Sequence, residues 1–234
     1  MTKSWITDRY NDIRWVLDNP EDIIQKQLIE GRWFEQQYLD VMKKYCPDNA
    51  NILDIGANIG NHSVYFSKYF NANQIISIEP IPRFYKLLLA NIAINYCHNI
   101  NVNYLGVALG DRECTGYPFL VFGKNNLGSM RLNPTPMNNL VDTDHIYAPV
   151  NVICGDSLFN DVDVNFIKMD VEGMEMVALD GLKNTIDRYR PPMFIEVGHD
   201  NDDFFEQWLI NNNYISVYCD RYPSLHSNHM ILPA

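Results

Sequence analysis

One stretch of the chain constrains its fold more than any other, the run NILDIGANIGNHSVYF at residues 51–66. Its apolar start predicts a buried strand, and its end has the spacing of a helix, with Gly56 and Gly60 at the join. A strand that passes through a glycine-bearing turn into a helix is typical of an open α/β sheet, where ligands bind at the carboxyl ends of the strands. This stretch therefore predicts a ligand site directly after the strand.

Short apolar segments alternate with helical ones along most of the chain, which predicts parallel strands joined by crossover helices. The expected strands cover residues 51–56, 74–80, 101–109, 165–170, 192–198, 214–219 and 227–234. The expected helices begin at about residue 61, pass through Phe84 and Leu88, span 174–186 with one apolar face, and pass through Phe205 and Leu209.

Two regions lie outside this alternation. In residues 1–48, Asn19 before Pro20 predicts the start of one helix, and apolar spacing from Phe34 to Tyr45 predicts a second. Residues 111–154 lose helical periodicity and predict strands and irregular loops, an insertion between the third and fourth strands. We expect a single domain over residues 1–234, with its core formed by 49–110 and 155–234.

The composition of the chain limits the classes of partner that it can bind. The chain has 234 residues, of which 47% are hydrophobic, enough for one large core. Its 18 Lys and Arg against 29 Asp and Glu give a formal charge of −11, which disfavours nucleic acids and anionic membranes as partners. The first residues lack an apolar stretch of signal length, and no segment has the roughly 18 apolar residues of a membrane span. We expect a soluble, cytoplasmic protein; the sequence leaves its oligomeric state open.

The glycine turn also limits the chemical class of the ligand. A dinucleotide-binding turn would have glycine where this chain has Asn58 and Asn61, so the pattern argues against NAD. Glu79 ends the next strand, where a carboxylate suits ribose hydroxyls, and Asp54 could reach an ammonium group. A ligand with a ribose, an amino acid part and no pyrophosphate fits S-adenosylmethionine. The alternative is a plain tight turn, with Glu79 merely capping a helix.

Four segments, LDIGANIGNHSVYF, ISIEPIP, GVALGD and FIKMDVEGMEMVALDG, in this order, resemble the FkbM family of S-adenosylmethionine-dependent methyltransferases. The resemblance covers about residues 31–197. It implies a Rossmann-like class I methyltransferase fold, an α/β structure with a mostly parallel seven-stranded sheet and helices on both faces. It also implies an O-methyltransferase that acts on a hydroxyl of a sugar, glycan or other small hydroxylated molecule.

The resemblance also assigns residues to the cofactor. It implies that the ribose lies at Glu79, that the adenine lies near Val107 and Ala108, and that Glu35 is an acid upstream of the first motif. The full set of expected cofactor residues is Glu35, Asp54, Gly56, Asn58, Gly60, Asn61, Glu79, Val107, Ala108 and Asp170.

Methyl transfer to an alcohol is an in-line displacement that is assisted by removal of the hydroxyl proton. Asp170 stands at the carboxyl tip of the fourth core strand, which makes it the first candidate for the base or for a metal ligand. Glu196 and His199 end the neighbouring strand and are the other catalytic candidates, and Lys168 could pair with Asp170. His226 is expected at the surface or sheet edge. We expect a metal-free base mechanism; the alternative is Mg²⁺ held by Asp170 and Glu196.

We expect the insertion to form the acceptor side of the pocket. The polar residues that suit a hydroxyl-rich acceptor are Asn125, Asn126, Ser129, Arg131 and Asn138, and Lys124 with Arg131 could accept a carboxylate or phosphate. Glu172 is a further acceptor-binding candidate, although an acid there could instead stabilise a helix N-terminus. The alternative for the insertion is a solvated hairpin without ligand contact.

Two other functions remain open at this point. An RNA 2′-O-methyltransferase shares this fold and usually uses a Lys-Asp-Lys-Glu tetrad. Asp170 could serve in that tetrad, but matching lysines are not evident and the net charge opposes RNA. A non-catalytic module that keeps the fold is the third class, and the intact DIGANIG and KMDVEG segments argue against it.

Overall fold

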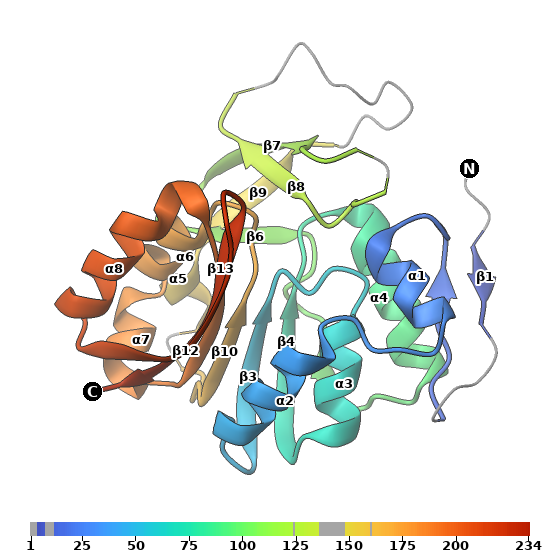
Figure 1. Ribbon diagram of the computed structural model, residues 1–234, viewed down its shortest axis with the longest axis horizontal. Helices are drawn as coiled ribbons and strands as arrows, with labels where there is room; N and C mark the ends of the chain where they lie inside the picture. The colour runs from blue at the N-terminus through green and yellow to red at the C-terminus, as the bar shows by residue number, and fades with distance from the viewer. Residues whose placement is uncertain (1–3, 8–11, 124, 136–147, 160) are drawn as a thin grey trace.

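A seven-stranded, mainly parallel sheet forms the centre of the computed structural model, which describes residues 4–7, 12–123, 125–135, 148–159 and 161–234 (Figure 1). The strand order is β12-β13-β11-β10-β3-β4-β5, and β13 is antiparallel to both of its neighbours. The predicted mostly parallel sheet is thus confirmed. Its strands are β3 (Ala50–Ile55), β4 (Ala72–Ile78), β5 (Ile100–Asn101), β10 (Phe166–Met169), β11 (Met193–Gly198), β12 (Tyr214–Tyr222) and β13 (His226–Pro233).

Helices cover both faces of this sheet (Figure 1). Successive side chains of a strand point to opposite faces, so Ile52 packs in one hydrophobic core and Leu53 in the other. The Ile52 face is covered by α1 (Ile23–Ile29), α2 (Gln36–Tyr45), α3 (Asn61–Tyr69) and α4 (Pro82–Ile94). The Leu53 face is covered by α5 (Gly155–Phe159), α6 (Glu175–Gly181), α7 (Lys183–Tyr189) and α8 (Asp202–Asn211). None of the described helices has the length and apolar content to cross a membrane.

A second, four-stranded sheet lies above the carboxyl ends of the central strands (Figure 1). It contains β6 (Val107–Gly110), β7 (Cys114–Leu120), β8 (Met130–Asn133) and β9 (Val150–Cys154) in the order β6-β9-β7-β8, and a separate pair joins β1 (Trp5–Ile6) and β2 (Val16–Leu17). The single strand expected over 101–109 is therefore wrong. The chain turns at Gly106, where φ is +87° and the N–H donates to the Glu79 carbonyl, and so β5 and β6 belong to different sheets.

Two helix predictions also need correction. The first helix begins after Asp22 rather than Asn19, because the Asp22 carboxylate accepts the N–H groups of Ile24 and Gln25. The helix expected over 174–186 is two helices that meet at Leu182. There Gly181 lies against β6, so that a Cβ on it would stand 1.8 Å from the carbonyl oxygen of Gly110.

The N-terminal extension and the insertion contact one another directly. A second oxygen of Asp22 accepts the N–H of Leu127 at 2.9 Å, and Ile23 donates its N–H to the Asn125 carbonyl at 2.9 Å. Asp22 is buried, and it bridges the first turn of α1 to the loop before β8. Two segments that the chain separates by about a hundred residues thus form one continuous wall beside the carboxyl ends of β3 and β4.

Candidate active site

A cavity of about 330 Å³ lies where β3, β4, β10 and β11 end, beneath the insertion. Its volume falls in the range typical of small-molecule sites, and apolar residues form most of its walls. The central sheet supplies its floor, α1 and the segment before α2 supply one side, and β6 and β8 supply the roof. The polar and charged residues that line it are Glu35, Asn58, Glu79, Asn126, Asp170, Glu172, Glu196 and His226.

Glu79 stands at the β4 end of this cavity and is almost fully buried. One of its carboxylate oxygens accepts the N–H of Asn58 at 2.8 Å, and the other accepts the N–H of Ile81 at 2.8 Å. Burial raises the pKa of Glu79 to about 7 against the lowering effect of these two hydrogen bonds. Each oxygen keeps a free lone pair, so the carboxylate is fixed in place and can still accept two ligand hydroxyls.

The glycine turn after β3 lies between the β4 end and the β10 end of the cavity. Gly56 has φ of +78°, and a Cβ on it would lie 1.8 Å from the carbonyl oxygen of Asp170. Glycine is therefore required at this position because the turn after β3 touches the backbone after β10. The first glycine of the motif thus brings the cofactor turn and the candidate base together, a role that its sequence position did not reveal.

Lys168 lies beneath the cavity, buried in the sheet. Its Nζ donates to the Gly56 carbonyl at 2.9 Å and stands 3.6 Å from Asp54 Oδ1 and 3.8 Å from Asp170 Oδ2. Burial alone would lower the pKa of Lys168, but the charges of Asp170 and Asp54 raise it overall. Asp54 therefore meets an ammonium group, as its position suggested, but this ammonium belongs to the protein.

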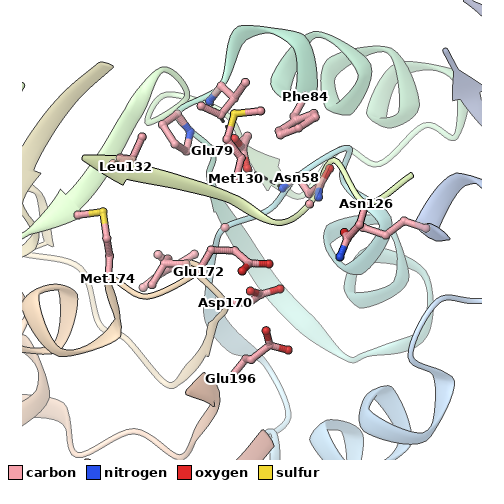
Figure 2. A pocket seen from close by; sticks show the side chains of 18 of the residues that line it. Asn58, Glu79, Phe84, Asn126, Met130, Leu132, Asp170, Glu172, Met174 and Glu196 are labelled. Atoms are coloured by element: carbon pink, nitrogen blue, oxygen red, sulfur yellow. Dashed lines mark hydrogen bonds between the residues drawn. The ribbon is translucent and has the colours of Figure 1, made fainter. Parts of the chain in front are cut away.

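Three carboxyl groups converge at the β10 end. Asp170, Glu172 and Glu196 each offer an oxygen, and these oxygens lie within 4.8 Å of one another (Figure 2). Burial and then the charge of Asp170 raise the pKa of Glu172 to about 8, and the same two causes raise that of Glu196 well above its ordinary value. Such a group can share protons, and its spacing and oxygen chemistry would also suit a hard cation.

Glu35 extends this acidic region from the N-terminal side. It lines the cavity, and burial followed by the charge of Asp170 raises its pKa to about 8. Its Oε2 lies 3.5 Å from Nε2 of the buried His62, whose pKa is lowered to about 3 by burial and then by the charge of Lys168. Because His62 is neutral at pH 7, this contact suits a protonated Glu35.

Three residues of the cavity wall have a strained backbone. Glu35, Asn58 and Glu172 line it, and their φ angles of 59°, 50° and 53° are left-handed although none is glycine. Such conformations cost of order 1 kcal/mol each and are maintained by surrounding contacts, commonly at functional sites. The strain lets a loop residue turn its side chain into the cavity, where a regular strand or helix would aim it elsewhere.

The structure brings together most, but not all, of the residues expected from the sequence. Glu35, Gly56, Asn58, Glu79, Ala108, Asn126, Asp170, Glu172 and Glu196 line the cavity. Asp54, Gly60, Asn61, Val107, Ser129, Arg131 and His199 are not among its lining residues. His199 is largely exposed and pairs with Asp202 at 3.1 Å, whereas Ser129 donates to the Asn126 carbonyl within its own loop. Lys124 and Asn138 lie outside the described residues.

Some lining residues escaped the sequence analysis. His226, expected at the surface, lines the cavity because the antiparallel pairing of β13 with β11 brings its Nδ1 within 3.6 Å of Glu196 Oε1. Burial lowers its pKa. Phe122 and Leu225 also line the cavity, from the turn after β7 and the turn between β12 and β13. Alternation along the last strand could have suggested His226; nothing in the sequence marks the other two.

The residues present fit S-adenosylmethionine. Glu79 offers a fixed acceptor for ribose hydroxyls, and the apolar walls from Ile78 to Phe84 and at Ala108 and Leu109 suit an adenine. The acidic end suits the positive sulfonium and ammonium groups of this cofactor. The fold and this cavity define a Rossmann-like methyltransferase that uses S-adenosylmethionine.

The chain belongs to the FkbM methyltransferase family. The Methyltransferase FkbM domain matches residues 54–217, which is most of the chain. Methyltransferase 1 of Beauveria bassiana is 25% identical over 193 residues, which cover 77% of this chain and 75% of the relative. The hexuronic acid methyltransferase AglP of Haloferax volcanii is 24% identical over 177 residues, or 74% of this chain and 65% of AglP.

A solved structure supports the fold. The FkbM methyltransferase of Methylobacillus flagellatus KT superposes with a TM-score of 0.54 at 19% sequence identity. The match covers 78% of this chain but 44% of that one, so the present chain spans less than half of that protein. At this identity the likeness establishes the fold; the acceptor and the roles of individual residues have to be argued from the site.

Proposed function

We propose that this methyltransferase transfers the methyl group of S-adenosylmethionine to a hydroxyl of a sugar, glycan or other small hydroxylated molecule, with Asp170 as the base. The observation that carries the proposal is the position of Asp170. Its side chain lines the cavity between the turn after β3 and the carboxyl groups of Glu172 and Glu196. A hydroxyl held there would lie beside a carboxylate and opposite Asn126 (Figure 2).

The bound cofactor supplies an electrophilic methyl group on a positively charged sulfur. A C–O bond forms as the C–S bond breaks, and the hydroxyl proton passes to the Asp170 carboxylate. Lys168 places a positive charge behind this carboxylate, with its Nζ 3.8 Å from Asp170 Oδ2. Glu172 and Glu196, which hold protons more readily, can donate hydrogen bonds to the acceptor. Alignment of the two reactants in the cavity supplies much of the rate.

The acceptor side of the cavity supports a small molecule. Asn126 faces the acidic end from the insertion, and its amide can both donate to and accept from a sugar hydroxyl. The relative AglP is named for a hexuronic acid, which is a sugar derivative, and this is consistent with the class of acceptor proposed. An RNA acceptor is less well supported, since no Lys or Arg is found among the cavity residues that the structure describes.

A turnover assay tests the proposal directly. S-adenosylmethionine with a labelled methyl group is incubated with the enzyme and separate pools of glycosides, polyols, phenols, short RNAs and amines. We expect label in the glycoside or polyol pools, in an ether that resists mild base. Label in RNA or amines alone would overturn the proposed acceptor, and cofactor binding without label in any pool would indicate a non-catalytic module.

The same assay tests the need for a metal. We propose that turnover does not require a cation, because the carboxylate of Asp170 can accept the proton by itself. Exhaustive chelation followed by dialysis is expected to leave kcat unchanged within about twofold. If chelation abolished turnover and Mg²⁺ restored it, Asp170, Glu172 and Glu196 would be assigned as ligands of that cation instead.

A further inference from the structure

Three exposed apolar side chains lie where the cavity opens to solvent. Ile23, Phe122 and Leu225 line the cavity and remain 40%, 56% and 49% exposed. They come from three separate segments, the start of α1, the turn after β7 and the turn between β12 and β13. We call these three residues the apolar rim. Single exposed apolar residues are common on proteins, but several that border one cavity are typical of a ligand-binding surface.

The backbone of the apolar rim is held by hydrogen bonds. Ile23 donates its N–H to the Asn125 carbonyl at 2.9 Å, and Phe122 donates its N–H to Ser129 Oγ at 3.1 Å. The carbonyl of Leu225 accepts the backbone N–H of the residue that follows β11 at 3.0 Å. A surface whose backbone is already fixed loses less conformational entropy when a ligand covers it. The apolar rim is therefore preorganised for contact with a ligand.

Two loops contribute both a polar and an apolar residue to the cavity. The chain after β7 carries Phe122 and Asn126, and the turn between β12 and β13 carries Leu225 directly before His226. In each pair the polar residue is half-buried and the apolar residue is exposed. Asn126 faces the acidic end (Figure 2), and His226 Nδ1 lies 3.6 Å from Glu196 Oε1. Polar contacts are thus offered inside the cavity, and apolar contacts are offered at its opening.

This order of polar and apolar contacts determines which acceptors gain most from binding. A hydroxylated group at Asp170 lies among the polar residues, and whatever is attached to it extends towards the apolar rim. Complete removal of one methylene from water corresponds to about fourfold in an equilibrium constant. Because the rim residues remain about half exposed, a chain that lies on them keeps part of its contact with water. Five methylenes should therefore contribute at least about tenfold, less than complete burial would give.

We infer that the acceptor is amphiphilic, with a hydroxylated head inside the cavity and an apolar tail that lies on the side chains of Ile23, Phe122 and Leu225. The inference rests on the proposed O-methylation and specifies its substrate class. It makes Phe122 and Leu225, which the sequence did not mark, determinants of acceptor specificity. A hydroxylated head without a tail is then a poor substrate, because it leaves the apolar rim in water.

The first test measures binding to the apolar rim without any methyl transfer. The enzyme is saturated with S-adenosylhomocysteine and titrated with N-phenyl-1-naphthylamine, a neutral probe whose fluorescence rises in apolar surroundings. We expect saturable binding, with a Kd that Phe122→Ser and Leu225→Ser each raise at least about threefold. The controls Phe204→Ser and Leu89→Ser change exposed apolar residues of α8 and α4 that do not line the cavity, and they should leave Kd within about twofold. Absence of saturable binding, or equal effects of rim and control substitutions, overturns the inference.

The second test compares two acceptors with the same head, methyl β-D-glucopyranoside and hexyl β-D-glucopyranoside. We expect kcat/KM for the hexyl glycoside to be at least about tenfold higher, and Phe122→Ser and Leu225→Ser each to reduce this ratio at least about threefold. Phe204→Ser and Leu89→Ser should leave the ratio unchanged. Equal kcat/KM for the two glycosides, or a ratio that neither rim substitution reduces, overturns the inference. If neither glycoside is methylated, the sugar acceptor of the proposed function is wrong, and binding of the probe still decides whether the apolar rim holds an apolar tail.

Discussion

At the β4 end of the cavity a single carboxylate, Glu79, lies directly after β4 and is held by two backbone N–H groups. At the β10 end, Asp170, Glu172 and Glu196 face one another, and burial followed by the charge of Asp170 raises the pKa of Glu172 and of Glu196. A carboxyl group thus serves for ligand recognition at the β4 end, where backbone N–H groups hold it. At the β10 end, where carboxyl groups face one another, it serves for reactivity. Each of the following predictions tests one side of this comparison.

Asp170→Asn should have the largest effect. The amide cannot accept the hydroxyl proton, and kcat should fall about 10²- to 10⁴-fold, the usual contribution of a general base. The Kd for S-adenosylmethionine should rise by much less than kcat falls, because Glu79 and the apolar walls still hold the cofactor. Single-turnover kinetics with labelled methyl and calorimetry measure the two quantities, with the exposed Asp203→Asn as control. Unchanged kcat would move the base to Glu172, Glu196 or Glu35.

Lys168→Met tests the buried ion pairs beneath the β10 end of the cavity. Removing one partner of a buried pair leaves Asp54 and Asp170 without their ammonium, and the free energy of unfolding should fall by about 3–5 kcal/mol. The double variant Lys168→Met/Asp54→Asn should recover most of this loss, yet its kcat should stay low. Denaturant titration and kinetics separate the two effects.

The control for this pair is Lys183→Met, which removes an exposed ammonium paired with Asp187. That substitution should cost less than about 1 kcal/mol, because solvent screens the pair. If Lys168→Met destabilised the protein no more than this control, the network under the cavity would have no special role. If the double variant recovered kcat as well as stability, Lys168 would be a purely structural residue.

Glu79→Ala tests the recognition end. It removes the acceptor of two ligand hydroxyls, and cofactor affinity should weaken by about 2–3 kcal/mol, or about 30- to 150-fold. At saturating cofactor, kcat should change far less than in Asp170→Asn. Glu79→Gln keeps one carbonyl acceptor and should fall between alanine and the native residue. Unchanged affinity in calorimetry would exclude a ribose contact at Glu79.

The smallest expected effect is the dependence of the free energy of unfolding on pH. Glu35 and Glu172 have folded-state pKa values of about 8, above their ordinary value of 4.5, so the folded state binds more protons between these pH values. The free energy of unfolding should therefore fall as pH rises from about 5 to 8. We expect this loss to appear as a lower Tm at pH 8 than at pH 5. Glu172→Gln should flatten this dependence, and a Tm that rises with pH would contradict it.

The sequence predicted the parts of the site that depend on local order. The glycine turn, Glu79 at a strand tip and Asp170 at another follow from one βα unit at a time, and parallel pairing then places them at one edge. It could not predict contacts that depend on tertiary pairing. The position of His226 requires the antiparallel register of β13 with β11, and the break at Leu182 requires the close approach of Gly181 to Gly110.

Local chemistry also misled in places. Asp54 lies one strand residue before the turn, a position from which the cofactor seemed reachable, but alternation points it into the core that α3 covers, where Ser63 donates to it. Asn19 and Pro20 have the composition of a helix start, but Asp22 satisfies the backbone of α1 and of the insertion together. In both cases a contact made in the folded structure determines the role of the residue, and the sequence does not reveal that contact.

The Asp22 bridge has a consequence for exchanging parts between relatives. The loop at residues 125–127 takes its shape from two hydrogen bonds to the start of α1, and both segments contribute cavity walls. If the insertion were transplanted without its own α1, the loop at residues 125–127 would lose both hydrogen bonds that hold it. The N–H of Leu127 would then lack its carboxylate acceptor, and the Asn125 carbonyl would lack the N–H of Ile23. Chimaeras that aim to transfer acceptor preference should therefore carry residues 22–29 together with residues 111–154 as one cassette.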